Sequence, residues 1–421
     1  MQQRYEWKLK NGLEVIYNHY PQAASFAVNA IGKAGSMYEQ KHPGIAHFLE
    51  HVVLDATKKY PDEESLSRVI TDVGGASNGG TNRDYVTFYA VTLAKDAERA
   101  FDHVSEVTIH PLIHNKSVGK QKKIISEEIK MYATDPSSFA YDRSVELLYP
   151  DSRVGGLITG ALEDISILKQ EDLRDFHSQL YTSSRFILSL CGPLPPEEVK
   201  KLAEEYFSAM PSGNEEKDTE AVPHDAEFNI EVANWQDVSH AHIYFQYHAP
   251  EIEDDRMYAT KMMGDILGGH ELSRLFVSIR EKHGLSYHIS SHHNPSHRYG
   301  YITVYAGISD ENIEKFLKLY TQETQRIVEG GVSEEEFKRT RNRVLASFLF
   351  KSDSPKSTAA QYGYNRLFAP EVYTFEDIAE RYRQVTREDI QKAAQDILTQ
   401  PPKISVVSKG LSEESFRSVF N

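Results

Sequence analysis

The sequence predicts an α+β protein made of two duplicated domains, each a mostly antiparallel sheet with helices packed on one face. The first observation is an internal repeat: VTFYAVTLAKDAERAF (residues 86–101) aligns without a gap with ITVYAGISDENIEKFL (residues 302–317). Each copy has the pattern of a strand, a short turn and an amphipathic helix. The second observation is that strands and helices are grouped within each half, which is typical of the α+β class.

A polar, acidic segment divides the chain near its middle. Residues 211–227, PSGNEEKDTEAVPHDAE, contain almost no large apolar side chain, as expected of a linker in this chain of 421 residues. A repeat of about half this length indicates a domain duplication rather than a solenoid. We therefore predict a first domain at 1–212, a linker at 213–225 and a second domain of the same fold at 226–421.

The elements are predicted in chain order from periodicity and turn residues. The Asn11-Gly12 pair between two alternating segments predicts a hairpin. Apolar spacing predicts the remaining elements as a strand at 78–90, helices at 97–109, 118–132, 254–267 and 272–282, and a strand at 301–307.

Composition and charge limit the possible partners. The 47 Lys and Arg residues against 62 Asp and Glu residues give a formal net charge of −15, which disfavours nucleic-acid binding and favours basic peptides. No apolar stretch approaches the ~18 residues of a membrane span, so no membrane association is expected. One cysteine, Cys191, suits a reducing compartment, and the cytoplasm is the expected location. Cys191 itself is expected to be a small buried residue near a strand end.

Residues 44–57, GIAHFLEHVVLDAT, have the pattern of a metal-binding helix. His47 and His51 are four residues apart, so both imidazoles lie on one face of the helix and can reach one cation. Imidazole nitrogens favour Zn²⁺, and catalytic zinc takes three protein ligands plus water. Glu50 is adjacent on the helix surface, where it can face a water molecule without being a ligand.

The third ligand is expected on a second helix, within KQKKIISEEIKMY. Glu128 falls inside an apolar arc of that helix, whereas Glu127 points about 100° away, toward solvent. A carboxylate on an apolar face is costly unless it is paired or binds a metal. The residues that define the arc are Ile124, Ile125, Ile129 and Tyr132.

With these residues the chain resembles the inverzincins, the pitrilysin-like and mitochondrial-processing-peptidase-like zinc metallopeptidases, whose motif is His-x-x-Glu-His. The resemblance covers nearly the whole chain and is to the small two-domain members. It implies that His47, His51 and Glu128 bind zinc and that Glu50 is the general base.

The resemblance also extends to substrate-binding segments. GGASNGGTNRDYVTFY resembles the family's edge strand, to which substrate backbone adds, and this implies substrate-binding positions at Asn78 and Thr81. ILGGHELSRLFVSIREKHGLSYHISS resembles the C-terminal signature. This second likeness implies that Arg280 holds the substrate and that Tyr287 hydrogen-bonds its carbonyl or oxyanion.

Three positions depart from the family pattern, the smallest departure being Ala56, where glycine is usual after the pentad. Gln121 stands seven residues before Glu128, where an acidic residue is common, and its absence could weaken ligand orientation. Gly79 replaces the usual alanine of the edge strand, which could loosen that edge.

The predicted function is that of a zinc metalloendopeptidase that hydrolyses extended, unstructured peptides. Relatives of this size pair as homodimers or heterodimers, so a dimer is expected. The main alternative is a non-catalytic scaffold or partner subunit of the same family, which Gln121 favours. A third possibility, the S-ribosylhomocysteine lyases, shares the pentad but is far shorter and places a cysteine near its metal.

Overall fold

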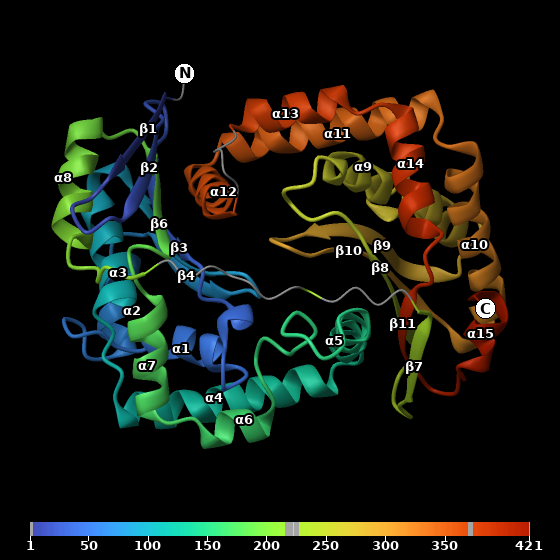
Figure 1. The fold of residues 1–421 in the computed structure, drawn as a ribbon, viewed down its shortest axis with the longest axis horizontal. Helices are drawn as coiled ribbons and strands as arrows, with labels where there is room; N and C mark the ends of the chain where they lie inside the picture. Colours follow the sequence, from blue (N-terminus) through green and yellow to red (C-terminus); the bar gives the residue numbers. More distant parts are fainter. Residues whose placement is uncertain (1–2, 215–221, 223–226, 369–373, 421) are drawn as a thin grey trace. The chain divides into compact units, whose positions relative to one another are not determined.

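The computed structural model describes residues 3–214, 222, 227–368 and 374–420 (Figure 1). The chain forms two compact units, each assembled from separate stretches of sequence. The first unit takes Met1–Lys130, Gly156–Thr219 and Leu349–Phe375, and the second takes Met131–Gly155, Glu220–Phe348 and Glu376–Asn421. Among the described helices, none is both long and apolar enough to cross a membrane. The predicted linker at 213–225 falls mostly outside the described residues.

The first unit contains a six-stranded sheet in the order β1-β2-β6-β3-β5-β4. Its strands are β1 (Gln3–Lys8), β2 (Glu14–His19), β3 (Ser25–Gly32), β4 (Ala76–Thr81), β5 (Val86–Leu93) and β6 (Phe186–Gly192). Every neighbouring pair is antiparallel except β2 and β6. The predicted hairpin is confirmed, with Tyr5 opposite Tyr17 and Gly12 at a φ of 90° in the turn.

One strand prediction was wrong. Residues 78–90 do not form a single strand, because β4 ends at Thr81 and the chain reverses before β5 begins at Val86. The Asn82 N–H donates to the Tyr85 carbonyl at 2.8 Å and closes the turn. Alternation of side chains continues on both sides of a tight turn, so periodicity alone did not reveal the reversal.

Helices cover both faces of this sheet. The helices that belong wholly to the first unit are α1 (Ile45–Val53), α2 (Glu63–Thr71), α3 (Ala97–Ile109), α6 (Leu162–Ile167), α7 (Gln170–Leu180), α8 (Pro196–Phe207) and α12 (Pro355–Phe368), and α4 (Asn115–Thr134) lies in it up to Lys130. Helix α3 packs on β3 and β5, and α12 packs on β3 and β6. Because β3 alternates, Phe26, Val28 and Ala30 join the main core while Ala27 joins Cys191 and Ala359 of α12.

All seven residues of β6 are buried, because helices cover both faces of the sheet. Cys191 is fully buried there, as the sequence predicted. Helix α12 approaches closely because Gly363 has no side chain: a Cβ at this position would lie 3.0 Å from Ile31 and from Ser189.

The second unit repeats the same strand order with one strand fewer. Its strands are β7 (Asn229–Asn234), β8 (Ala241–His248), β9 (Ser286–Pro295), β10 (Gly300–Ile308) and β11 (Lys403–Ser408). They are ordered β7-β11-β8-β10-β9, which matches β2-β6-β3-β5-β4, and the single parallel pair, β7 and β11, matches β2 and β6. The duplicated α+β fold is therefore confirmed.

The helices of the second unit include one of an unusual type. They are α5 (Pro136–Leu148), α9 (Arg256–Gly268), α10 (Ile313–Gly330), α14 (Arg387–Leu398) and α15 (Glu414–Phe420), together with α11 (Glu334–Ser352) as far as Phe348 and α13 (Phe375–Gln384) from Glu376. The helix predicted at 272–282 is largely a π-helix, Phe276–Glu281. The Lys282 N–H bonds the Val277 carbonyl, five residues earlier, at 3.0 Å.

Each half of the sequence contributes one helix to the other half's compact unit. Helix α5 lies before the midpoint of the chain but packs on β8 and β11, and α12 lies near the end but packs on β3 and β6. The compact units therefore differ from the predicted boundaries 1–212 and 226–421 by these two exchanged segments. The predicted packing of helices on one face of the sheet holds for the helices that come from the same half of the sequence. The exchanged helix, α12 or α5, covers the other face.

A salt bridge in the second unit gives the first prediction. Glu336 of α11 accepts hydrogen bonds from the Arg274 guanidinium at 2.7 and 3.0 Å and from the Ser333 backbone N–H at 2.8 Å. Burial opposes ionisation, but these partners lower the pKa of Glu336 from 4.5 to about 2. We expect Glu336→Gln to lower the free energy of unfolding in urea by about 2 kcal/mol at pH 7.

The pH dependence follows from the sign of that shift. A folded-state pKa below the unfolded one stabilises the protein above about pH 4.5, and this contribution is lost as the pH falls toward 2. The difference between wild type and variant should therefore shrink at pH 3. The control is Glu335→Gln, an exposed residue paired with Arg339, which we expect to change stability by less than about 0.5 kcal/mol.

Candidate metal centre

Helix α1 is held firmly at its start. Its N-terminal N–H groups, those of Gly44 and Ala46, both donate at 2.9 Å to the carboxylate of Glu39. Gly44 has a φ of 81°, and a Cβ there would lie 2.4 Å from the Thr159 carbonyl oxygen. The apolar side chains that bury one face of the helix are Ile45, Phe48, Leu49, Val52 and Val53. The position of the remaining residues, including both histidines, is thereby fixed.

Helix α4 presents Glu128 as the sequence predicted. Glu127 is exposed and pairs with Lys130 at 2.7 Å, while Glu128 is half-buried between the buried residues Ile125 and Ile129. The predicted apolar arc was too wide, because Ile124 is 44% exposed and Tyr132 is 39% exposed. The narrower arc still contains Glu128, so the selection of this residue does not change.

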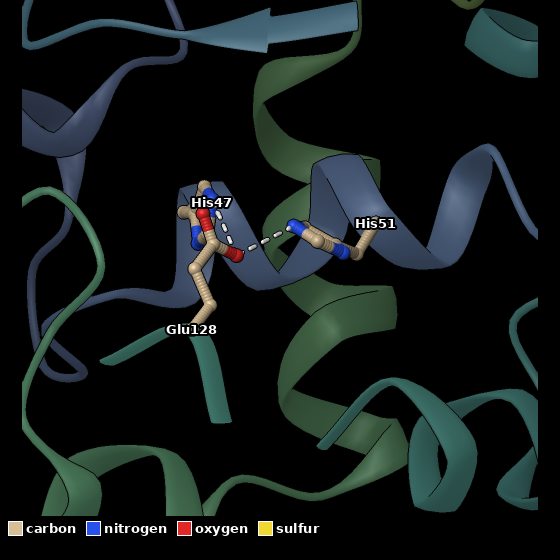
Figure 2. Close-up of side chains that lie close together, drawn as sticks. All are labelled: His47, His51 and Glu128. Atoms are coloured by element: carbon tan, nitrogen blue, oxygen red, sulfur yellow. Dashed lines mark ion pairs between the residues drawn. The ribbon is translucent and has the colours of Figure 1, made fainter. Parts of the chain in front are cut away.

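The three predicted ligands lie together. The Glu128 Oε2 atom is 3.8 Å from His47 Nε2 and 3.4 Å from His51 Nε2, and the carboxylate faces both rings (Figure 2). One ligand atom from each residue lies within 4.8 Å of the others. Zinc bonds of about 2.1 Å in tetrahedral geometry separate ligand atoms by roughly 3.4 Å. Two imidazole nitrogens and one carboxylate oxygen at this spacing therefore fit Zn²⁺, and no other such group occurs within the described ranges.

Burial keeps the first histidine neutral. Desolvation lowers the pKa of His47 to about 4, and the neighbouring His51 acts in the same direction. A neutral imidazole has a free lone pair on one nitrogen, as metal binding requires.

Glu50 lies beside this cluster in a partly apolar environment. Burial raises the pKa of its carboxyl group, although a hydrogen bond from Thr81 and the proximity of His51 oppose the shift. The Thr81 hydroxyl donates to Glu50 Oε2 at 2.6 Å. This contact joins α1 to β4 and holds the carboxylate in one orientation. The sequence placed Thr81 in the substrate strand but did not predict its contact with Glu50.

Strand β4 is at the edge of its sheet and, within the described part of the chain, pairs with β5 alone. Asn78 is exposed on it. Gly79 is opposite Phe88 and packs under Leu54, where a Cβ would lie 2.9 Å from Leu54 Cδ1. The glycine therefore accommodates Leu54, a role in packing that the sequence did not indicate.

Arg280 and Tyr287 lie together in the second unit, whereas the predicted metal ligands belong to the first. Arg280 Nη1 donates to the Tyr287 carbonyl at 2.9 Å, and its guanidinium carbon lies 5.0 Å from the centre of the Tyr287 ring. The Tyr287 side chain is accessible to another molecule, because its exposed fraction is 86%. The predicted substrate contacts of both residues stay a prediction.

Comparison with protein families identifies the chain by two adjoining regions. Residues 14–159 match the family described as "Insulinase (Peptidase family M16)", and residues 168–344 match the "Peptidase M16 inactive domain". The chain belongs to peptidase family M16. The three predicted ligands and Glu50 all lie in the first matched region of this M16 chain, so the predicted inverzincin family is confirmed.

Curated relatives of the M16 chain carry names that mention zinc. An "Uncharacterized zinc protease YmxG" of Bacillus subtilis is 24% identical over 95% of this chain and 97% of its own. An "Uncharacterized zinc protease" of Rickettsia bellii is 25% identical over 95% of this chain and 96% of its own. With the His-His-Glu cluster, these names confirm the predicted zinc cofactor.

Solved structures of similar proteins share the fold. A "peptidase M16 inactive domain" from Pseudomonas fluorescens has a TM-score of 0.90 at 19% identity, covering 97% of this chain and 99% of that one. A protease from Helicobacter pylori also has a TM-score of 0.90, at 18% identity, covering 97% of this chain and all of that one. The described M16 chain thus has the two-unit fold of these proteins.

Proposed function

We propose that the protein is a zinc-dependent endopeptidase that cleaves extended, unstructured peptides. The observation that carries this proposal is the position of Glu50, which lies next to the ligand His51 and is held by Thr81 of an edge strand. A carboxylate with a raised pKa beside a three-donor metal site is the arrangement that hydrolysis requires. A scaffold subunit has no need for such a base.

The chain's own residues supply binding, orientation and proton transfer. His47, His51 and Glu128 would hold zinc, which when bound supplies Lewis acidity toward a peptide carbonyl and toward water. Glu50 accepts a proton from the attacking water and delivers it to the leaving amine. Burial raises the pKa of Glu50 toward neutral pH. A group whose pKa is close to the operating pH is suited to both accepting and delivering the proton. Thr81 keeps the Glu50 carboxylate oriented toward the same region.

The edge strand suggests how the substrate is bound. The free side of β4 offers unpaired backbone groups, to which an extended peptide can add as a further strand. Backbone hydrogen bonds depend little on side chains, so we propose broad specificity, with a preference for basic peptides because of the net charge of −15. Arg280 and Tyr287 are proposed to hold the substrate and its carbonyl oxygen.

The test is hydrolysis of an unstructured peptide with the metal content measured in parallel. We expect about one zinc per chain, cleavage at internal peptide bonds, and loss of cleavage when a chelator removes the zinc. Zinc binding without hydrolysis would instead favour the scaffold alternative. Light scattering of the same sample tests the proposed pairing of two chains, alike or different.

Thr81 offers a finer test of the mechanism. Thr81→Val removes the hydroxyl that donates to Glu50 but keeps the side-chain shape. We expect kcat to fall about 10-fold, because a hydrogen bond to a charged group contributes about 1.5 kcal/mol or more. Thr81→Ser should restore most of the rate, and the zinc content should not change in either variant. A Thr81→Val enzyme with normal kcat would show that this contact has no role in turnover.

A further inference from the structure

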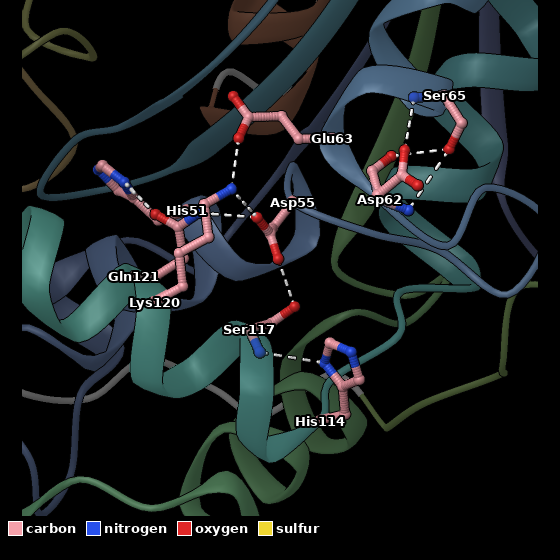
Figure 3. A network of polar contacts seen from close by, with 9 residues as sticks. All are labelled: His51, Asp55, Asp62, Glu63, Ser65, His114, Ser117, Lys120 and Gln121. Carbon is pink, nitrogen blue, oxygen red and sulfur yellow. Dashed lines mark hydrogen bonds and ion pairs between the residues drawn. The ribbon is translucent and has the colours of Figure 1, made fainter.

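We propose that Gln121 and Asp55 form a positioning relay that fixes the ring orientation and the tautomer of the zinc ligand His51. His51 Nδ1 lies 3.3 Å from Gln121 Oε1, and Gln121 Nε2 donates to Asp55 Oδ1 at 3.1 Å. Figure 3 shows these contacts. Gln121 and Asp55 are both buried. This relay acts on the zinc site and is independent of peptide hydrolysis.

The relay follows from the pairing of two helices. Gln121 is seven residues, or about two turns, before Glu128, so both project from the same face of α4. His51 is followed four residues later by Asp55, just beyond the end of α1. Glu128 contacts His51, and Gln121 contacts both His51 and Asp55. His51 precedes Asp55 whereas Glu128 follows Gln121, so the two elements run in opposite directions.

The direction of each hydrogen bond follows from chemistry. An ionised Asp55 can only accept, so the Gln121 amide must direct its NH₂ toward Asp55 and its oxygen toward His51. An amide oxygen accepts hydrogen bonds, so His51 Nδ1 must carry the proton. The lone pair is then left on Nε2, the atom that faces Glu128 at 3.4 Å.

Asp55 is held in the ionised form that this relay needs. Burial opposes ionisation, but hydrogen bonds from Lys120, Ser117 and Gln121 together lower the pKa of Asp55. The Ser117 hydroxyl donates to Asp55 Oδ2, and Lys120 Nζ donates to Asp55 Oδ1 at 2.6 Å.

Further contacts hold these partners in place (Figure 3). Lys120 also binds Glu63 at 2.6 Å. Glu63 lies in the first turn of α2, whose start is fixed by a capping box between Asp62 and Ser65. On α4, the backbone N–H of Ser117 donates to His114 Nδ1 at 3.2 Å.

The relay compensates for the lack of an acidic residue at position 121, which was expected to weaken ligand orientation. The carboxylate that is common at this position is absent, but Asp55 supplies one a single hydrogen bond farther from the histidine. The other histidine has no such support, because His47 Nδ1 is buried and has no hydrogen-bond partner among the residues that the structure describes. The orientation of the two histidine rings therefore depends on the relay from His51 to Gln121 and Asp55.

The first experiment measures the zinc dissociation constant of the full chain by competition with a chelator. Gln121→Met keeps the approximate length of the side chain and removes both hydrogen bonds. We expect zinc to bind about 10- to 100-fold more weakly, the usual cost of removing such a partner. Unchanged affinity in Gln121→Met would overturn the proposal. The control is Gln246→Met, a buried glutamine with two side-chain hydrogen bonds in the second unit, which should leave zinc affinity unchanged.

A pair of substitutions that moves the negative charge from Asp55 to position 121 tests the relay even if Gln121→Met does not fold. Gln121→Glu places a second carboxylate against Asp55 and should weaken zinc binding. Adding Asp55→Asn restores a donor opposite the new carboxylate and should recover most of the affinity. Tighter zinc binding in Gln121→Glu alone, or no recovery in the double variant, would contradict the relay.

The tautomer is a readout that needs neither zinc nor activity. In the zinc-free protein, the ¹⁵N chemical shifts of His51 should show the proton on Nδ1. Gln121→Met should lose this preference, because no acceptor then faces that nitrogen. A zinc-free wild type with the proton on Nε2 of His51 would refute the assignment. Loss of peptidase activity with normal tautomer and normal zinc affinity would instead bear on the proposed function alone.

Discussion

Replacing Glu50 by Gln is expected to lower kcat for peptide hydrolysis by about 10²- to 10⁴-fold, the range found for positioned general bases. The amide cannot accept the water proton, although it keeps the shape and can still accept the hydrogen bond from Thr81. Because Glu50 is not one of the three metal ligands, bound zinc should stay near one per chain. Peptide affinity, measured as KM or by direct binding, should change little.

The comparison variant is Glu127→Gln, an exposed residue of α4 that pairs with Lys130 on the side away from the metal ligands. It should retain wild-type zinc content and wild-type kcat. If Glu50→Gln lost its zinc, or still turned over at the wild-type rate, Glu50 would not be the base.

Glu128→Gln is expected to weaken zinc binding by at least about 100-fold. An apparent zinc-binding free energy of about 10–16 kcal/mol, divided over a few ligands, assigns roughly 3 kcal/mol to each. The neutral amide removes the one anionic donor that faces both histidines. Zinc stoichiometry and affinity should be measured with peptide cleavage on the same samples, and activity should return in part when excess zinc is supplied.

Glu127→Gln serves here as the adjacent residue on the same helix. Its side chain points to solvent, so the same chemical change one residue away should leave the zinc dissociation constant unchanged. Equal zinc affinity in Glu128→Gln and wild type would exclude Glu128 as a ligand and with it the proposed three-donor site.

Much of the fold and the site could be predicted because the signals are local. The alternation and turn residues of the first hairpin, the apolar spacing of residues 97–109 and the repeat of 86–101 in 302–317 all describe single elements or adjoining ones. The two histidines lie on one helix, and Glu128 was found because an acidic side chain on an apolar face is costly. The strand prediction failed where the local pattern continues unbroken, at the β4–β5 turn, and the spacing did not reveal that the helix at 272–282 is largely a π-helix.

Helical spacing and residue chemistry are properties of short segments, and they sufficed to predict the duplicated α+β halves and the cluster of His47, His51 and Glu128 with Glu50 beside it. Packing decided the rest. The amphipathic pattern of a helix does not specify which sheet it covers, so the exchange of α5 and α12 between the halves appears only in the folded chain. Likewise, no sequence pattern links Asp55 with Gln121, because 66 residues separate them. Only the folded chain brings the Asp55 carboxylate and His51 into contact with the Gln121 amide.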